Sequence, residues 1–321
     1  MTQDERLAGT PGTPPETAGE RSDDRRAFFA AAIGAAAIGT GAFLFADPLS
    51  AQTITDADVL NFALNLEYLQ ANYYGYASAG AGLATADTQS GAATPTPGSS
   101  VTPGRQATFS DATVAAYAKE MAADQLAQVR FLRTQLATSA VAQPAIDLGY
   151  SATSAFSVMA QNAGLVGSGV AFDPYASDAN FLLGAFFLQD IAVSAYQGMV
   201  SLLTSQSYRE AVGGLMATEA YHAALVRTTL YQKSVATPAL LDQVNTISNY
   251  RDSLDGGSDD DQGISPVGSV ANIAPVDSNG NTFPRASGAV LNILFLTRIS
   301  TTKGGFFPGG VNGNITTSAA S

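Results

Sequence analysis

A single histidine limits the chemistry open to this chain of 321 residues. His222 ends the motif Glu219-Ala220-Tyr221-His222, a Glu-x-x-His sequence inside a predicted helix. Spacing of three residues places both side chains on one face of a helix, where a carboxylate and an imidazole can bind one metal ion. The chain contains no cysteine, which excludes disulfides, zinc ribbons, iron–sulfur clusters and thiol nucleophiles. Sites that need two imidazoles from one chain are also excluded.

Charge and length narrow the classes of function further. The chain carries 27 acidic and 15 basic residues, a formal net charge of −12. Nucleic acids bind to basic stripes, so we expect no nucleic-acid partner. The length suffices for one large core or two modest ones.

The N-terminal segment is typical of a twin-arginine export signal. Arg25-Arg26 stands before Phe28-Phe29 and a nearly uncharged run that ends at Ala46. We expect cleavage after Ala51, so that residues 1–51 form the signal and the mature chain is periplasmic or at the cell surface. The alternative is an uncleaved anchor, since about 20 apolar residues can span a bilayer; we expect membrane contact only through that anchor.

Apolar residues that recur every three or four positions predict four long helices: 56–77, 112–137, 178–204 and 207–234. Thr55 and Asp111 are expected to cap the first two, and residues 207–210 form an expected capping box for the fourth. A fifth helix is expected from residue 237 and a short apolar one near 287–298.

The connections between these helices predict the fold class. The segment 78–110 consists mostly of small residues and proline, which is typical of a long surface loop, and 138–177 is a long connection with one short helix near 152–163. An all-α antiparallel four-helix bundle with one long crossover is the ferritin-like arrangement. We expect this bundle and its additional helix over 52–250, and a loop-rich C-terminal extension that packs on it over 251–321.

Several stretches resemble one family, the ferritin-like proteins that include plant and bacterial desiccation-related proteins. The stretches that carry the resemblance are 62–74, 129–133, 181–198, 251–255 with 261–263, and 304–308, and the similarity covers essentially the whole mature chain. The resemblance implies a ferritin-like bundle that is often exported and has a role in stress or desiccation. It does not establish an activity.

A dinuclear metal centre in this fold takes one glutamate from each of two helices and a Glu-x-x-His pair from each of the other two. Glu67 fits one position on the first helix, and Glu219 with His222 supplies one complete pair on the fourth. These three residues are the candidate metal ligands.

Glutamine occupies the other three template positions. Gln125 and Gln128 stand where the second helix would supply its pair, and Gln189 stands where the third would supply a glutamate. Two metal ions would bring four positive charges, which the two remaining carboxylates would balance only by half, and each uncompensated buried charge costs several kcal/mol. The neighbouring Asp124 is rotated by about 100° from Gln125 and is not expected to replace it.

Three states of the centre remain open. The glutamines can bond to Glu67, Glu219 and His222 in a metal-free polar network, which we favour. Alternatively, those two carboxylates and the imidazole bind a single iron or manganese ion. An active dinuclear centre is the third.

These states correspond to different functions. The metal-free network predicts an exported ferritin-like protein with a degenerate dinuclear site, without catalysis, that acts in stress or desiccation protection or in envelope structure. A residual metal site would make the chain an oxidoreductase that handles peroxide or oxygen. A third alternative is a surface component that self-assembles as a homo-oligomer.

Two other groups of residues allow a chemical and a structural interpretation. Asp255 and the aspartates at 259–261 could bind calcium, but they lack the closing glutamate of an EF-hand and favour a solvated acidic loop. Tyr68, Tyr73, Tyr74 and Tyr76 could carry redox chemistry beside a metal, but packing is the more common role of such clusters.

Overall fold

The computed structural model describes residues 54–257 and 261–321. By their contacts, residues 54–257, 261–276 and 282–321 form one compact unit, and the helices described below belong to it. Residues 277–281 belong to another unit; within them the Asp277 carboxylate accepts hydrogen bonds from the backbone N–H groups of Asn279 and Asn281. The predicted export signal, Asp259 and Asp260 lie outside the described residues.

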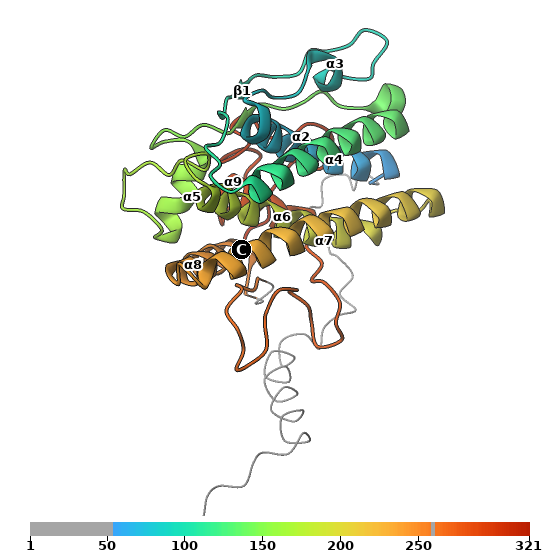
Figure 1. Cartoon of the computed structure of the whole chain (residues 1–321). Helices are drawn as coiled ribbons and strands as arrows, with labels where there is room; N and C mark the ends of the chain where they lie inside the picture. The colour runs from blue at the N-terminus through green and yellow to red at the C-terminus, as the bar shows by residue number, and fades with distance from the viewer. Residues whose placement is uncertain (1–53, 258–260) are drawn as a thin grey trace, which may run out of the picture. The chain divides into compact units, whose positions relative to one another are not determined.

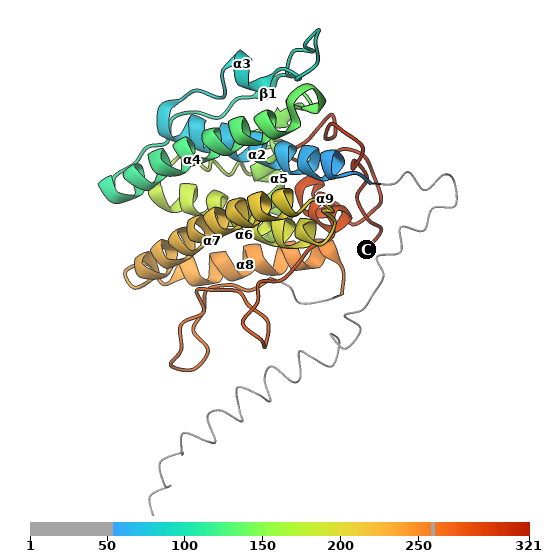
Figure 2. The ribbon, with the colours of Figure 1, turned by 90° about the vertical axis from the view of Figure 1, so that its right-hand side faces the viewer.

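Four long helices form the main unit, which confirms the all-α ferritin-like class. They are α2 (Asp56–Ala79), α4 (Ala112–Leu136), α6 (Asp178–Val200) and α7 (Gln206–Ser234). Helix α2 packs along α4, and α6 packs along α7 (Figures 1 and 2).

The shorter elements surround these two helix pairs: α3 (Thr85–Thr88), η1 (Ala137–Ser139), α5 (Ala155–Ala163), α8 (Ala239–Asp255) and α9 (Ser287–Phe295). Helix α8 packs on α5, α6, α7 and α9. The two strands β1 (Val101–Thr102) and β2 (Ile146–Asp147) pair in parallel, with Val101 opposite Ile146. Sequence periodicity did not predict α3 or the strands, because elements of two to four residues carry no readable period.

Two predicted caps begin their helices as expected. Thr55 and Asp58 form a reciprocal capping box at the start of α2. The Asp111 carboxylate accepts hydrogen bonds from the backbone N–H groups of Thr113 and Val114 at the start of α4. These side chains satisfy N–H groups that have no partner inside the helix.

The predicted capping box at residues 207–210 was wrong. Helix α7 begins at Gln206, and no side chain of its own N-cap residue bonds to it. Instead, the Asp56 carboxylate of α2 accepts hydrogen bonds from the backbone N–H groups of Thr204 and Ser205, at 2.8 and 2.9 Å. A carboxylate at a helix N-terminus is favourable whichever part of the chain supplies it.

The segment 78–110, predicted as a long loop, is held against α4 and lies on the outer side of the α2–α4 pair (Figure 1). Arg130 of α4 forms a two-pronged ion pair with Asp87, with both N–O distances at 2.9 Å. Arg133 donates to the backbone carbonyl of Gln89 and to the Tyr68 hydroxyl. Side chains of α4 therefore fix a segment that has few large apolar residues of its own.

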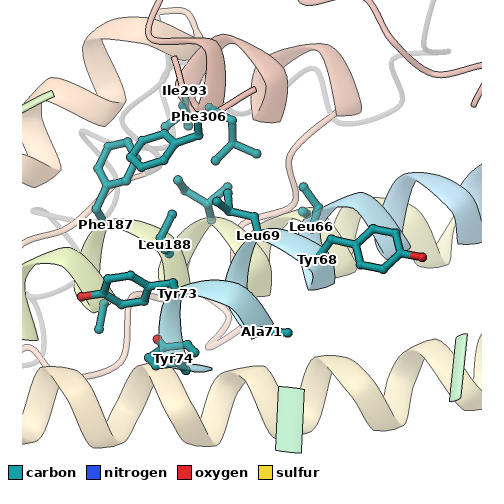
Figure 3. Close-up of a cluster of buried hydrophobic side chains, with 14 of the residues drawn as sticks. Leu66, Tyr68, Leu69, Ala71, Tyr73, Tyr74, Phe187, Leu188, Ile293 and Phe306 are labelled. Carbon is teal, nitrogen blue, oxygen red and sulfur yellow. The ribbon is translucent and has the colours of Figure 1, made fainter. Parts of the chain in front are cut away.

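Aromatic side chains fill the core among the leucines of α2 and α6 (Figure 3). The rings of Phe187 and Phe306 stack at 5.5 Å, and those of Tyr73 and Tyr74 meet edge to face at 5.1 Å. Among the described helices, α6 alone is long and apolar enough to cross a membrane, and 89% of that apolar window is buried in the unit. This burial is what a core helix shows.

A buried ion network fixes α8 and the following loop to α6 and α7. Asp190 of α6 accepts from Arg227 and from Arg251, both at 2.8 Å. Asp261 pairs with Arg251 at 2.7 Å and with Arg285 at 2.6 Å. The side chains of Arg227 and Arg251 are fully buried, so their charges depend on these partners.

This network also corrects the interpretation of the acidic segment. Asp255 pairs with Arg285 at 2.5 Å and Asp261 pairs with two arginines, and both carboxylates are buried. At these two positions the acidic segment is neither a solvated loop nor a calcium site, because guanidinium groups already balance the charges.

Gly198 in α6 permits a close approach that no other residue would. A Cβ there would lie 2.0 Å from the carbonyl oxygen of Arg285, whose N–H bonds to the carbonyl of Ser194. We expect Gly198→Ala to lower the free energy of unfolding by about 1–3 kcal/mol through this overlap. Gly213 in α7 has no atom near its added Cβ, so Gly213→Ala should raise stability by about 1 kcal/mol. Urea unfolding of both variants tests the pair, and equal effects would contradict it.

Candidate metal centre

The four long helices bring all six template positions into the interior of the bundle. Four of these residues are completely buried: Glu67, Gln125, Gln189 and Glu219. Gln128 and His222 are also buried, but each keeps a small exposed fraction. The spacing of the template positions along each helix therefore predicted the burial of these side chains correctly.

Glu219 is the residue to which the amides bond. Gln125 Nε2 donates to Glu219 Oε1 at 2.7 Å, and Gln189 Nε2 donates to Glu219 Oε2 at 2.9 Å. His222 Nδ1 lies 3.9 Å from Glu219 Oε1, beyond hydrogen-bond distance. Helices α4 and α6 thus each supply an amide to the carboxylate of α7.

Glu67 bonds to a tyrosine, whereas we had expected a glutamine. The hydroxyl of Tyr196, on α6, donates to Glu67 Oε1. Burial raises the pKa of Glu67 well above its ordinary value, the charge of Glu219 raises it further, and the Tyr196 hydrogen bond opposes both. Glu67 therefore holds its proton to a higher pH than an exposed glutamate does.

The pKa of Glu219 is also raised, with burial as the main cause. Nearby His222 and the hydrogen bonds from Gln189, Gln125 and Gln128 act in the opposite direction. Compared with Glu67, Glu219 has more donors that stabilise its charged form.

His222 has its partner on the outer side. His222 Nε2 lies 3.1 Å from Asp124 Oδ2. The predicted rotation of Asp124 away from Gln125 explains this contact, because a side chain turned out of the centre reaches the outer nitrogen of the imidazole. The Tyr74 hydroxyl completes the surroundings and donates to Gln189 Oε1 at 3.0 Å.

Comparison with known proteins identifies the family of the bundle. Residues 55–232 match the model of the ferritin-like domain family. The chain belongs to this family. Two relatives of this ferritin-like chain are described below, and no solved structure matches it at a significant level.

Both relatives align with most of their own length and of this ferritin-like chain. The desiccation-related protein PCC13-62 of Craterostigma plantagineum is 26% identical over 271 residues, which cover 79% of this chain and 82% of the relative. The ferritin-like catalase Nec2 of Nesocodon mauritianus is 23% identical over 272 residues, which cover 81% and 84%.

The residues of this ferritin-like chain do not fit the dinuclear metal centre of the fold. Two carboxylates stand where four are needed, so the charge of two divalent ions would be balanced only by half. Both oxygens of Glu219 already accept hydrogen bonds from amides. Among the described residues, no three His, Asp or Glu side chains form a group that could hold a metal ion.

A single cation is a different case. Four polar atoms of the centre have no hydrogen-bond partner within the described part of the chain: Glu67 Oε2, Gln125 Oε1, Gln128 Oε1 and His222 Nδ1. Carboxylate oxygens, amide oxygens and an imidazole nitrogen are suitable ligands for one divalent metal ion such as iron or manganese. The charge of Glu219 acts on Glu67, but no hydrogen bond or ion pair joins Glu67 to Glu219 or His222 within the described residues.

Sequence reasoning missed two residues of the centre and misread one. Tyr196 lies seven residues after Gln189, two helical turns on the same face, so the spacing held a signal for it. Tyr74, for which packing was the favoured role, packs edge to face on Tyr73 and Phe181, and it also donates to Gln189, a bond that the sequence did not predict. Asp124 was excluded by its rotation, although a side chain on the outer face of α4 still reaches α7.

The raised pKa of Glu67 predicts how stability depends on pH. The folded state holds the proton of Glu67 above the ordinary value of 4.5, so stability from this group is complete at low pH and is lost as pH rises through the folded pKa. Glu67→Gln should therefore match the parent near pH 4 and exceed its stability above neutral pH. Urea unfolding across this range tests the prediction, with the exposed Glu120→Gln as control. A variant that becomes less stable than the parent as pH rises would contradict it.

Proposed function

We propose that this ferritin-like protein acts in stress or desiccation protection without catalysis. In place of the two metal ions of its fold, we propose a network of amide and carboxylate groups joined by hydrogen bonds. One observation carries the proposal. The amide groups of Gln125 and Gln189 donate to both oxygens of Glu219, at 2.7 and 2.9 Å. A carboxylate that accepts two amide donors is stabilised in place without a cation.

The similarity to a desiccation-related protein supports the protective role, since it extends over 79% of this chain. Family membership supports the bundle but not an activity, because one fold serves many functions. The protective role is therefore tested in cells and the centre in the purified protein.

Export belongs to the same proposal. Arg25-Arg26 and the weakly apolar run after them support twin-arginine export and removal of residues 1–51. Cell fractionation followed by N-terminal sequencing tests this part. We expect a shortened chain in the envelope fraction, and a full-length chain in the cytoplasm would contradict export.

Survival after drying tests the function itself. A strain without the protein should survive drying less well than its parent, and the wild-type gene should restore survival. The gene for His222→Gln should restore survival equally, because this variant places an amide at one more template position, in addition to the three that already hold glutamine. A variant that folds but fails to restore survival would show that the imidazole performs chemistry.

The second candidate is a metal-dependent oxidoreductase that acts on peroxide or oxygen. The four polar atoms without partners favour it, and so does the relative named as a ferritin-like catalase. Glu67, Glu219 and His222 would hold one ion, which would supply the redox chemistry. Oxygen release from hydrogen peroxide by manganese-loaded protein, abolished in Glu219→Ala and His222→Ala, would support it; no oxygen release from the loaded protein would exclude it.

A further inference from the structure

We propose that a polar groove between the start of α4 and the end of α7 binds a neutral sugar of the size of a monosaccharide. The groove has a volume of about 260 Å³, and its lining residues belong to these two helices or to the cap of α4. Tyr117, the last lining residue on α4, stands eight residues before Gln125, or about 12 Å along the helix. The groove is therefore separate from the centre, and the inference does not depend on the proposed function.

An ion pair joins the two walls of the groove and leaves the groove without net charge. Lys233 Nζ donates to Asp111 Oδ2 at 2.7 Å, and both side chains are partly exposed. The hydrogen bond from Lys233 is the main cause that lowers the pKa of Asp111, so the carboxylate is charged at neutral pH. Asp111 Oδ1 also accepts from the backbone N–H of Thr113, which caps the start of α4. A charged ligand would meet a like charge beside each opposite charge, so the groove favours a neutral one.

Neutral hydrogen-bonding groups line much of the remaining groove. The side chains of Thr113, Tyr117 and Gln232 make no hydrogen bond to any other group within the described residues, so they can bond to a ligand. Each of these three groups can both donate and accept. A sugar hydroxyl has the same two capacities, while Asp111 adds an acceptor and Lys233 adds N–H donors. The set therefore matches a molecule that carries several hydroxyl groups.

The size of the groove and its apolar residues favour a single sugar ring. Pockets for drug-sized ligands measure about 300–1,000 Å³, so a groove of about 260 Å³ suits a somewhat smaller molecule. Val114 is completely buried and Tyr117 is partly exposed, and these two side chains supply apolar surface for the C–H groups of a sugar. Because two helices hold the lining side chains in place before a ligand arrives, the entropic cost of binding is reduced.

Saturation-transfer NMR with glucose tests binding to the purified protein. Magnetisation should pass from the protein to the C–H groups of glucose and saturate with a dissociation constant on the order of 1–10 mM, as expected for a few hydrogen bonds in an open groove. Betaine, a zwitterion without hydroxyl groups, should receive no such transfer at the same concentration. Transfer that does not saturate, or equal transfer to glucose and betaine, would overturn the proposal.

Two double variants test whether the groove is the binding site. Tyr117→Ala with Gln232→Leu removes an aromatic ring and an amide from the groove, and it should weaken glucose binding about tenfold. Tyr221→Ala with Gln135→Leu makes the same two changes at exposed positions of α7 and α4 outside the groove, and it should bind glucose like the parent. All four side chains are at least partly exposed, so both variants should fold, and circular dichroism verifies this. Equal affinities of the two variants for glucose would contradict the proposal.

Discussion

Replacing Asp190 by alanine is expected to lower the free energy of unfolding by about 3–5 kcal/mol, because it leaves two buried guanidinium groups without their shared carboxylate. Asp190 Oδ2 lies 2.8 Å from both Arg227 and Arg251, whose side chains are fully buried. The loss would also release the loop that Arg227 holds through the backbone carbonyls of Gln262, Gly263, Asn272 and Ile273.

Denaturant unfolding measures this effect against two further variants. Asp190→Asn keeps the volume but not the charge, and it should lose most of the same free energy if charge pairing is the cause. Asp242→Ala, on the exposed face of α8, should change stability by less than about 1 kcal/mol. A loss for Asp190→Ala no greater than that of Asp242→Ala would contradict the role given to the network.

The second large effect is a gain of metal binding. The triple variant Gln125→Glu, Gln128→His and Gln189→Glu restores four carboxylates and two imidazoles at the template positions. We expect it to bind two iron or manganese ions, because the charges of the ligands then balance those of the metals. Its melting temperature should rise with metal concentration, by the equivalent of about 2.7 kcal/mol at 100 times the dissociation constant.

A matched control separates metal binding from repacking. The same triple variant with Glu67→Gln and Glu219→Gln has the same helices but only two carboxylates, and it should bind little metal. Without metal, the triple variant should be less stable than the parent, because it buries two additional acids. A folded triple variant that binds no metal would show that the glutamines do not occupy former ligand positions.

The sequence predicted the long helices well because each carries its own signal. The apolar period and the caps Thr55 and Asp111 are local, and the structure places these helices close to the predicted bounds. The predicted capping box of α7 was wrong, and the carboxylate that bonds just before this helix belongs to Asp56 of another helix, which no local pattern can reveal. The pairing of β1 with β2 depends likewise on contact between distant segments.

For the centre, spacing along each helix predicted which six residues turn inward, but not which of them would touch. Glutamine was expected to bond to Glu67, and the structure gives this place to Tyr196 of α6. The sequence did not predict the buried ion network either. Its members lie on separate segments that only the fold brings together: Asp190, Arg227, Asp261 and Arg285. Distances between helices, which the sequence does not contain, decide both cases.

Metal content measured on the purified mature protein tests the central claim most directly. The protein should be produced with iron and manganese supplied, purified without chelators, dialysed, and analysed by mass spectrometry of the elements. The amide contacts to both oxygens of Glu219 and the glutamines at three of the six ligand positions predict far less than one ion per chain. One or two ions per chain that remain bound through dialysis would contradict a metal-free centre.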